Sequence, residues 1–223
     1  MQFLFSSIGK KIQIAISGIF LCIFLIFHLL NNLTLFAGSG TFNQMVEMLE
    51  SIKPFVRIME FGLLFILLTH VINGIKLTLD NKKAKPTGYS LDAGSEISSL
   101  NSQTMIISGM VILGFFLIHL GYIWFTYQTH NFLTPQETYY DVLLRDQIGY
   151  LGHRFTAIFY ILAIVLIGFH LKHGFQSALK TFGILQDSRC SFLYKISFLF
   201  WGIIPAGFII IILSIQLGFI PSV

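Results

Sequence analysis

Charged side chains are scarce in this chain, and their scarcity limits what the protein can be. Only 11% of its 223 residues are Asp, Glu, Lys or Arg, whereas a soluble domain carries roughly a quarter. Cysteine is scarce too: Cys22 and Cys190 stand alone, without CxxC or metal-ligand spacing. These absences exclude an ordinary water-soluble domain, a disulfide scaffold and a cysteine metal site. We expect no nucleic-acid partner.

Apolar residues are abundant instead, and they are gathered into five long runs. Mean hydropathy is +0.78, and a run of about 20 apolar residues spans a bilayer as a helix, the form that satisfies its own backbone. We therefore predict an all-α fold, a single integral membrane domain over residues 1–223 with five transmembrane helices. Their predicted bounds are 12–36, 55–79, 105–127, 152–178 and 192–219.

Basic residues predict the orientation of the helices, because short cytoplasmic loops collect Lys and Arg. Ten of the 14 basic residues fall on the side of Lys10 and Lys11, so the N-terminus is predicted to be cytoplasmic. Two connections are long. The inner one, 80–103, suits either a docking surface for a soluble partner or a solvated linker. The outer one, 128–150, carries aromatic residues and is predicted to lie along the interface as a cap.

Histidines recur inside the apolar runs, where ionisable side chains are costly and mark functional sites. The first and third runs share a spacing: Ser17 lies 11 residues before His28, and Ser108 lies 11 residues before His119. This spacing puts each serine on the face of its histidine, about three turns away. A glycine follows each serine in both runs.

The second and fourth runs share a different pattern. Gly74 follows His70 by four residues, and Gly174 follows His170 in the same way. A glycine one turn from a ligand, on the same helix face, leaves room for a flat macrocycle. The residues predicted to pack around haem are Ser17, Ser108, Gly74 and Gly174.

Depth along the helices sorts the histidines into pairs. Counted at 1.5 Å per residue, His28 and His119 lie about 21–24 Å from the inner ends of their helices, and His70 and His170 about 22 Å from the outer ends. Two neutral imidazoles at one depth can supply both axial ligands of a haem iron. We therefore predict two haem b groups at two levels, with His28 and His119 on the outer one. Zinc is disfavoured, because it prefers a single four-ligand cluster.

The sequence allows two candidates for the fourth haem ligand. His173 lies three residues after His170 on nearly the same face, so either can be the fourth ligand; the pattern shared with His70 favours His170. At the outer helix ends, hydrogen-bonding and ionisable groups suit a menaquinone site, with Glu60 as the proton group. The predicted quinone or haem-propionate contacts are Arg57, Tyr150, His153 and Arg154. The competing interpretation is that Arg57 and Arg154 only anchor helix ends or pair with haem propionates.

Four segments carry a family resemblance: FLIFHLLNN, LLTHVINGIKL, ISGMVILGFFLIHLGY and GFHLKHGFQSALKTFGI. They are similar to the four ligand helices of the cytochrome b subunit, the di-haem b558 type, of succinate dehydrogenase and fumarate reductase. The resemblance implies a bacterial cytoplasmic membrane, with flavoprotein and iron-sulfur subunits docked on the cytoplasmic side. It also supports His170 over His173, and it leaves a dimer of complexes open. The alternatives are a cytochrome b of a hydrogenase or formate dehydrogenase, and a haem-free proton-coupled transporter.

Overall fold

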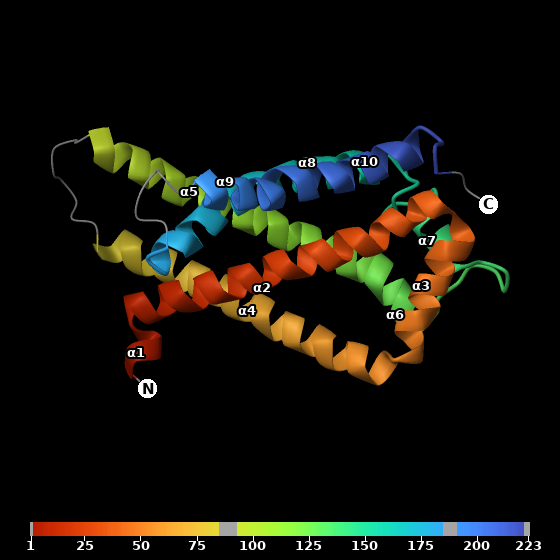
Figure 1. Ribbon diagram of the computed structural model, residues 1–223, viewed down its shortest axis with the longest axis horizontal. Helices are drawn as coiled ribbons and strands as arrows, with labels where there is room; N and C mark the ends of the chain where they lie inside the picture. The colour runs from red at the N-terminus through yellow and green to blue at the C-terminus, as the bar shows by residue number, and fades with distance from the viewer. Residues whose placement is uncertain (1, 85–92, 185–190, 221–223) are drawn as a thin grey trace.

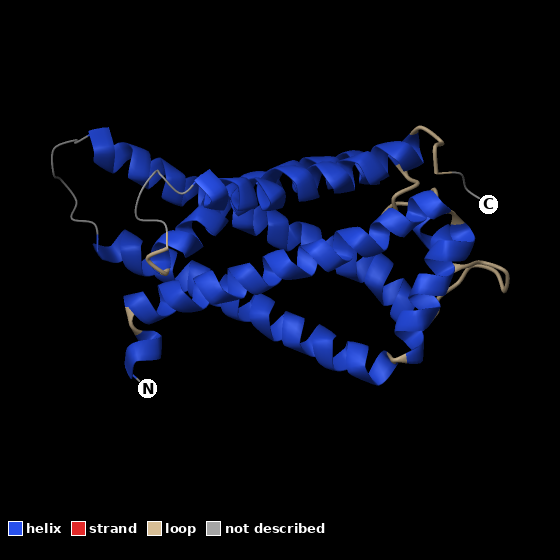
Figure 2. Cartoon of the chain, viewed as in Figure 1, coloured by secondary structure: helices blue, strands red, loops and turns tan. Residues whose placement is uncertain are grey.

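The computed structural model describes residues 2–84, 93–184 and 191–220. Within these ranges the chain forms helices joined by turns and loops, and no strand is present (Figure 2). The first half contains α1 (Gln2–Phe5), α2 (Ser7–Leu33), η1 (Thr34–Ala37), α3 (Ser39–Ser51) and α4 (Lys53–Ala84). The second half contains α5 (Ala93–His119), η2 (Leu120–Trp124), α6 (Phe125–Thr129), α7 (Tyr139–Leu144), α8 (Arg154–Thr181), α9 (Ser191–Phe198), η3 (Leu199–Ile203) and α10 (Ile204–Gln216).

Among the described residues, five helical stretches are long and apolar enough to cross a membrane, which confirms the predicted all-α fold with five such helices. They cover Ser7–Ala37, Lys53–Lys83, Thr104–Thr129, Arg154–Thr181 and Lys195–Gln216. Large apolar side chains such as Phe61, Phe65 and Phe155 point outward, 70% or more exposed. In lipid such side chains need no protein cover, because the surrounding tails are equally apolar.

The helices form a bundle in which α2 and α8 are central. α2 packs against α4, α8 and α10, while α8 also packs against α5 and the π-helical turn η3. In Figure 1, α2 crosses in front of α4 and α5, and α8 runs beside α10 along the upper edge. α3 and α7 pack on one another and close the end of the bundle opposite α1.

Helix ends differ from the predicted bounds for local reasons. α2 begins five residues before the apolar run, because the Ser6 hydroxyl accepts the Gly9 N–H at 3.0 Å and caps it. α10 ends at Gln216 rather than 219. There Gly218 adopts a left-handed conformation (φ 76°), and Phe219 N–H donates to the Ser214 carbonyl.

The two long connections contain more helix than their composition indicated. α4 continues to Ala84 and α5 begins at Ala93, so much of the inner connection is helical; residues 85–92 lie outside the described residues. In the outer connection, α7 buries Tyr140 and Leu143, which gives this end a packed aromatic and aliphatic cover. The short surface helix α3 was not predicted.

Candidate functional site: two histidine pairs

The structure brings four histidine rings together in two pairs. His28 on α2 faces His119 at the end of α5, with ring centroids 5.7 Å apart and planes at 82°. His70 on α4 faces His170 on α8, with centroids 6.3 Å apart and planes at 66°. These are the pairs that helix depth predicted. His170, rather than its neighbour His173, makes the ring contact with His70.

The first pair, which we call the outer pair, lies among aromatic rings. Phe24 stacks on His28 at 5.3 Å, and Phe208 from α10 approaches the same ring at 5.4 Å. Phe115 stacks on His119 at 5.7 Å. The Tyr160 hydroxyl on α8 lies 3.5 Å from Nδ1 of His119. The outer pair therefore sits in a largely apolar setting supplied by four spanning helices.

The second pair, the inner pair, has hydroxyl partners from the neighbouring helices. Ser17 Oγ lies 3.1 Å from Nδ1 of His70, and Ser108 Oγ lies 3.2 Å from Nδ1 of His170. Sequence spacing associated each serine with the histidine of its own helix. In the folded chain each serine contacts a histidine of the other pair, because helices cross and bring distant turns together.

Gly18 and Gly109, which directly follow Ser17 and Ser108, lie next to the histidine rings of the inner pair. A Cβ atom at Gly18 would lie 3.3 Å from Cε1 of His70, and one at Gly109 would lie 3.6 Å from Cε1 of His170. At Gly74 a Cβ would meet nothing within 4 Å, and at Gly174 only Met105 Cε at 3.8 Å. Close approach to the histidines is therefore made by the glycines that follow the serines, a role the sequence analysis did not assign.

Both pairs fit bis-histidine axial ligation of haem. Two imidazoles on opposite sides of one metal ion, each with a metal–nitrogen distance of about 2 Å, have ring centroids about 6 Å apart. The observed separations are 5.7 and 6.3 Å. Among the described residues, no three His, Cys, Asp or Glu side chains gather as a metal cluster. The donor set thus consists of two imidazoles at each of two levels.

Apart from the histidine pairs, a cluster of polar side chains joins the outer end of α4 to η2 and α6. Glu60 Oε2 accepts a hydrogen bond from Arg57 at 2.8 Å. Its Oε1 accepts from Trp124 Nε1 at 2.9 Å and from Gln128 Nε2 at 3.2 Å. Arg57 also lies over the Trp124 ring, 5.8 Å from its centroid. Arg57 and Glu60 therefore come together as predicted, but their partners Trp124 and Gln128 were missed, since the tertiary fold alone places them there.

Tyr150 belongs to a different network. Its buried hydroxyl contacts Thr126 Oγ1 at 2.8 Å and accepts from Arg145 at 3.0 Å. Arg145 binds both carboxylate oxygens of Glu137, at 2.7 and 2.6 Å, and donates to the Asn131 carbonyl at 2.9 Å. These hydrogen bonds hold the pKa of the Glu137 carboxyl below its usual value. The network ties the outer loop to the bundle.

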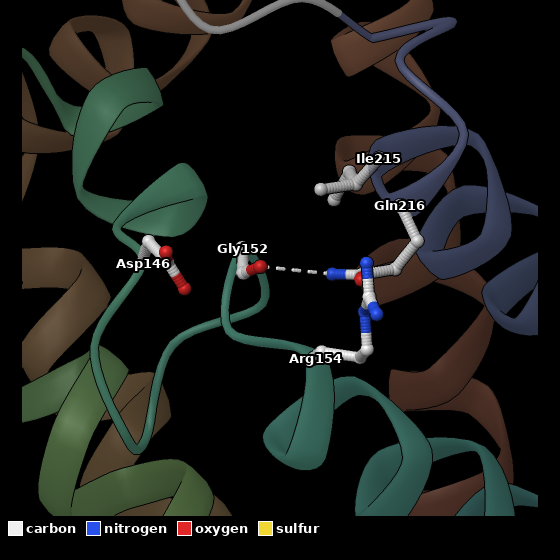
Figure 3. A pocket seen from close by; sticks show the side chains of 5 residues that line it. All are labelled: Asp146, Gly152, Arg154, Ile215 and Gln216. Carbon is white, nitrogen blue, oxygen red and sulfur yellow. Dashed lines mark hydrogen bonds between the residues drawn. The ribbon is translucent and has the colours of Figure 1, made fainter.

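His153 and Arg154 lie at the start of α8. His153 is the N-cap residue, and its Nδ1 lies 3.3 Å from Thr156 Oγ1. Arg154 lines a pocket of about 330 Å³ with Asp146, Gly152, Ile215 and Gln216. Figure 3 shows the Arg154 side chain beside Gln216, whose amide donates to the Gly152 carbonyl at 3.0 Å. The residues predicted to contact quinone therefore divide among three surroundings.

Residues 12–91 match the model of the succinate dehydrogenase/fumarate reductase transmembrane subunit family. Neither the curated proteins nor the solved structures gave a match. The matched segment contains His28 and His70, one histidine of each pair. Residues 12–91 are thus similar to the succinate dehydrogenase/fumarate reductase transmembrane subunit family, which supports the resemblance drawn from the histidine segments and covers the two that contain His28 and His70.

Proposed function

We propose that this multi-pass membrane protein is the di-haem cytochrome b subunit of a succinate:quinone oxidoreductase. The observation that carries the proposal is the pair of facing histidines at each of two levels, with separations that suit bis-imidazole ligation. The family match over residues 12–91 supports a membrane subunit of such a complex. Electrons pass between an iron-sulfur subunit and menaquinone in the membrane.

In this proposal His28 and His119 hold the outer haem b, and His70 and His170 hold the inner one. Haem iron supplies one-electron transfer when bound. The protein supplies neutral imidazole ligands from four helices, an aromatic setting for the outer pair and hydroxyl partners for the inner pair. Dicarboxylate chemistry belongs to the soluble subunits.

The inner end of the bundle faces the cytoplasm in this proposal, on the bacterial cytoplasmic membrane. The support is the distribution of basic residues, which short cytoplasmic loops collect. Those that the structure describes on this side are Lys10, Lys11, Lys76, Lys82, Lys83, Lys172, Lys180 and Lys195. A flavoprotein subunit and an iron-sulfur subunit dock there, and the oligomeric state of the complex is left open.

Menaquinone reacts at the outer end, where Glu60 is the proton group. The Glu60 carboxylate accepts from three donors, and its side chain retains 27% of its surface exposed. A partly exposed carboxylate in a hydrogen-bonded cluster can exchange protons with quinol on one side and water on the other. The Arg57 guanidinium lies 2.8 Å from the Glu60 carboxylate and compensates its negative charge.

Purification of the chain from native membranes tests the proposal. We expect a reduced-minus-oxidised spectrum with a b-type α-band and two haems per chain. Flavoprotein and iron-sulfur subunits should co-purify, and succinate or fumarate turnover should depend on a quinone analogue. Absence of haem would contradict the proposal and favour the transporter. Haem accompanied by a hydrogenase or formate dehydrogenase would assign the chain to another respiratory complex.

A further inference from the structure

Each histidine of the inner pair contacts a serine hydroxyl on the spanning helix that precedes its own. In α2 and α4 a serine hydroxyl meets Nδ1 of His70, and in α5 and α8 a serine hydroxyl meets Nδ1 of His170. Each serine is followed by a glycine that lies against the same ring. The Ser-Gly pair therefore holds a histidine on the next spanning helix, and the arrangement occurs twice in the chain.

The direction of these hydrogen bonds follows from their other partners. The Ser17 hydroxyl donates to the Gln13 carbonyl at 2.6 Å, so its single proton is already committed. Nδ1 of His70 also lies 3.2 Å from the Ile14 carbonyl, which can only accept. Ser108 repeats the pattern by donating to the Met105 carbonyl at 3.1 Å. With each hydroxyl proton donated to a backbone carbonyl, we assign the ring proton to Nδ1 of His70 and, by the repeated pattern, to Nδ1 of His170, which leaves Nε2 with the free lone pair.

Three successive polar side-chain contacts set the register of α2 against α4. Lys10 binds Asp80 at 2.6 Å, and Gln13 accepts from Asn73 at 3.0 Å. The contact of Ser17 with His70 is the third in this series. Positions 10, 13 and 17 share one face of α2, because they are three and four residues apart. These side-chain pairings therefore fix the position along α2 at which Ser17 meets His70.

We propose that Ser17 and Ser108 are positioning residues for the inner haem, each accepting the Nδ1 proton of His70 or His170 and so presenting Nε2 as the ligand nitrogen. The inference rests on the proposed haem function. Metal-bound histidines commonly donate their second ring N–H to an oxygen, which sets tautomer and orientation and makes the ligand more basic. A more basic ligand favours ferric iron, so loss of the acceptor raises the midpoint potential.

The two histidines of the inner pair differ in the number of acceptors near Nδ1. His70 has a second acceptor in the Ile14 carbonyl, so Ser17→Ala leaves its Nδ1 proton with a partner. The acceptor that the structure gives for His170 is Ser108. Ser108→Ala should therefore have the larger effect. Ser197→Ala is the matched control, because Ser197 is buried on α9 and has no hydrogen-bond partner among the described residues.

The test uses the purified complex, with a redox titration of the α-band and electron paramagnetic resonance of the ferric haems. In Ser108→Ala we expect one of two midpoint potentials to rise and one ferric signal to shift, with a smaller change in Ser17→Ala. Ser108→Thr, which keeps the hydroxyl, and Ser197→Ala should match the parent. Unchanged signals in Ser108→Ala, or equal shifts of both haems, would overturn the inference.

A second comparison covers the case in which Ser108→Ala loses a haem. Retention of both haems by Ser108→Thr would then support the role of the hydroxyl, whereas equal loss in both variants would overturn it. Failure of the haem proposal itself is distinguishable. It would appear as a parent complex without b-type haem, before any variant is compared.

Discussion

Trp124 Nε1 lies 2.9 Å from Oε1 of Glu60 and connects the π-helical turn η2 to α4. η2 begins directly after His119, so the contact links the helix of an outer-pair histidine to the carboxylate at the membrane edge. A π-turn within an α-helix is uncommon and is frequently found at functional sites. The Glu60 cluster therefore adjoins the outer pair through one helix.

Replacing Glu60 tests the quinone site. Glu60→Gln removes the ionisable group but keeps the side-chain size, so we expect quinone-linked turnover to be lost while both haem spectra remain intact. Steady-state menaquinol oxidation by the purified complex is the measurement. Glu50→Gln is the matched control, because Glu50 pairs with Lys53 on the same outer side and has no assigned role. Unchanged menaquinol oxidation in Glu60→Gln would remove Glu60 from the site.

The buried pair of Arg145 and Glu137 should contribute strongly to stability. Their side chains are only 5% and 9% exposed, and breaking such a pair typically costs about 3–5 kcal/mol because a buried charge remains. We expect Glu137→Gln to lower Tm by several degrees in detergent. The double variant Glu137→Gln/Arg145→Met should recover part of the loss. Lys53→Met, which breaks a partly exposed pair within one helical turn, should change Tm less than Glu137→Gln.

The same pair predicts a pH dependence of stability. The pKa of Glu137 is lowered in the folded chain from its ordinary value of 4.5, chiefly by the hydrogen bonds from Arg145. Its stabilisation is therefore complete above that value and is lost as pH falls through the lower, folded pKa. Thermal melts of the parent and of Glu137→Gln should differ at neutral pH and converge in acid. A constant difference down to acid pH would contradict this.

Helix packing predicts an effect at Gly168. A Cβ atom there would lie 3.1 Å from the Trp201 carbonyl oxygen, and backbone of the packed η3 turn cannot easily move away. Small residues at such crossings let spanning helices approach closely. We expect Gly168→Ala to lower Tm, with α8 and η3 forced apart. Gly62→Ala should be tolerated, since a Cβ at that position meets nothing within 4 Å.

The glycines beside the inner pair should differ in sensitivity. A Cβ at Gly18 would crowd Cε1 of His70 at 3.3 Å, whereas one at Gly109 would make an ordinary contact with His170 at 3.6 Å. Gly18→Ala should therefore change the ferric signal of the inner haem more than Gly109→Ala. Gly114→Ala, with nothing within 4 Å of the added atom, is the control. The reverse order of the first two would contradict the expected geometry.

Helix number and histidine pairing could be predicted because both depend on quantities measured along one helix. An apolar run determines a span, and the count of residues from its end determines the depth of a histidine. The helix α3 escaped prediction because it is short and only partly apolar. Trp124 and Gln128 escaped because their relation to Glu60 requires two helices to be placed side by side.

By itself the sequence determined that five segments are long and apolar enough to cross a membrane as helices, and it predicted that His28 shares a level with His119. Lipid cannot satisfy backbone groups, so a long apolar segment has one stable form, and its rise per residue sets every depth. Only the tertiary structure decided which side chains meet across helices. Ser17 contacts His70 rather than a group near His28, because crossing angle and rotation about the helix axis arise from side-chain packing, which hydropathy does not specify.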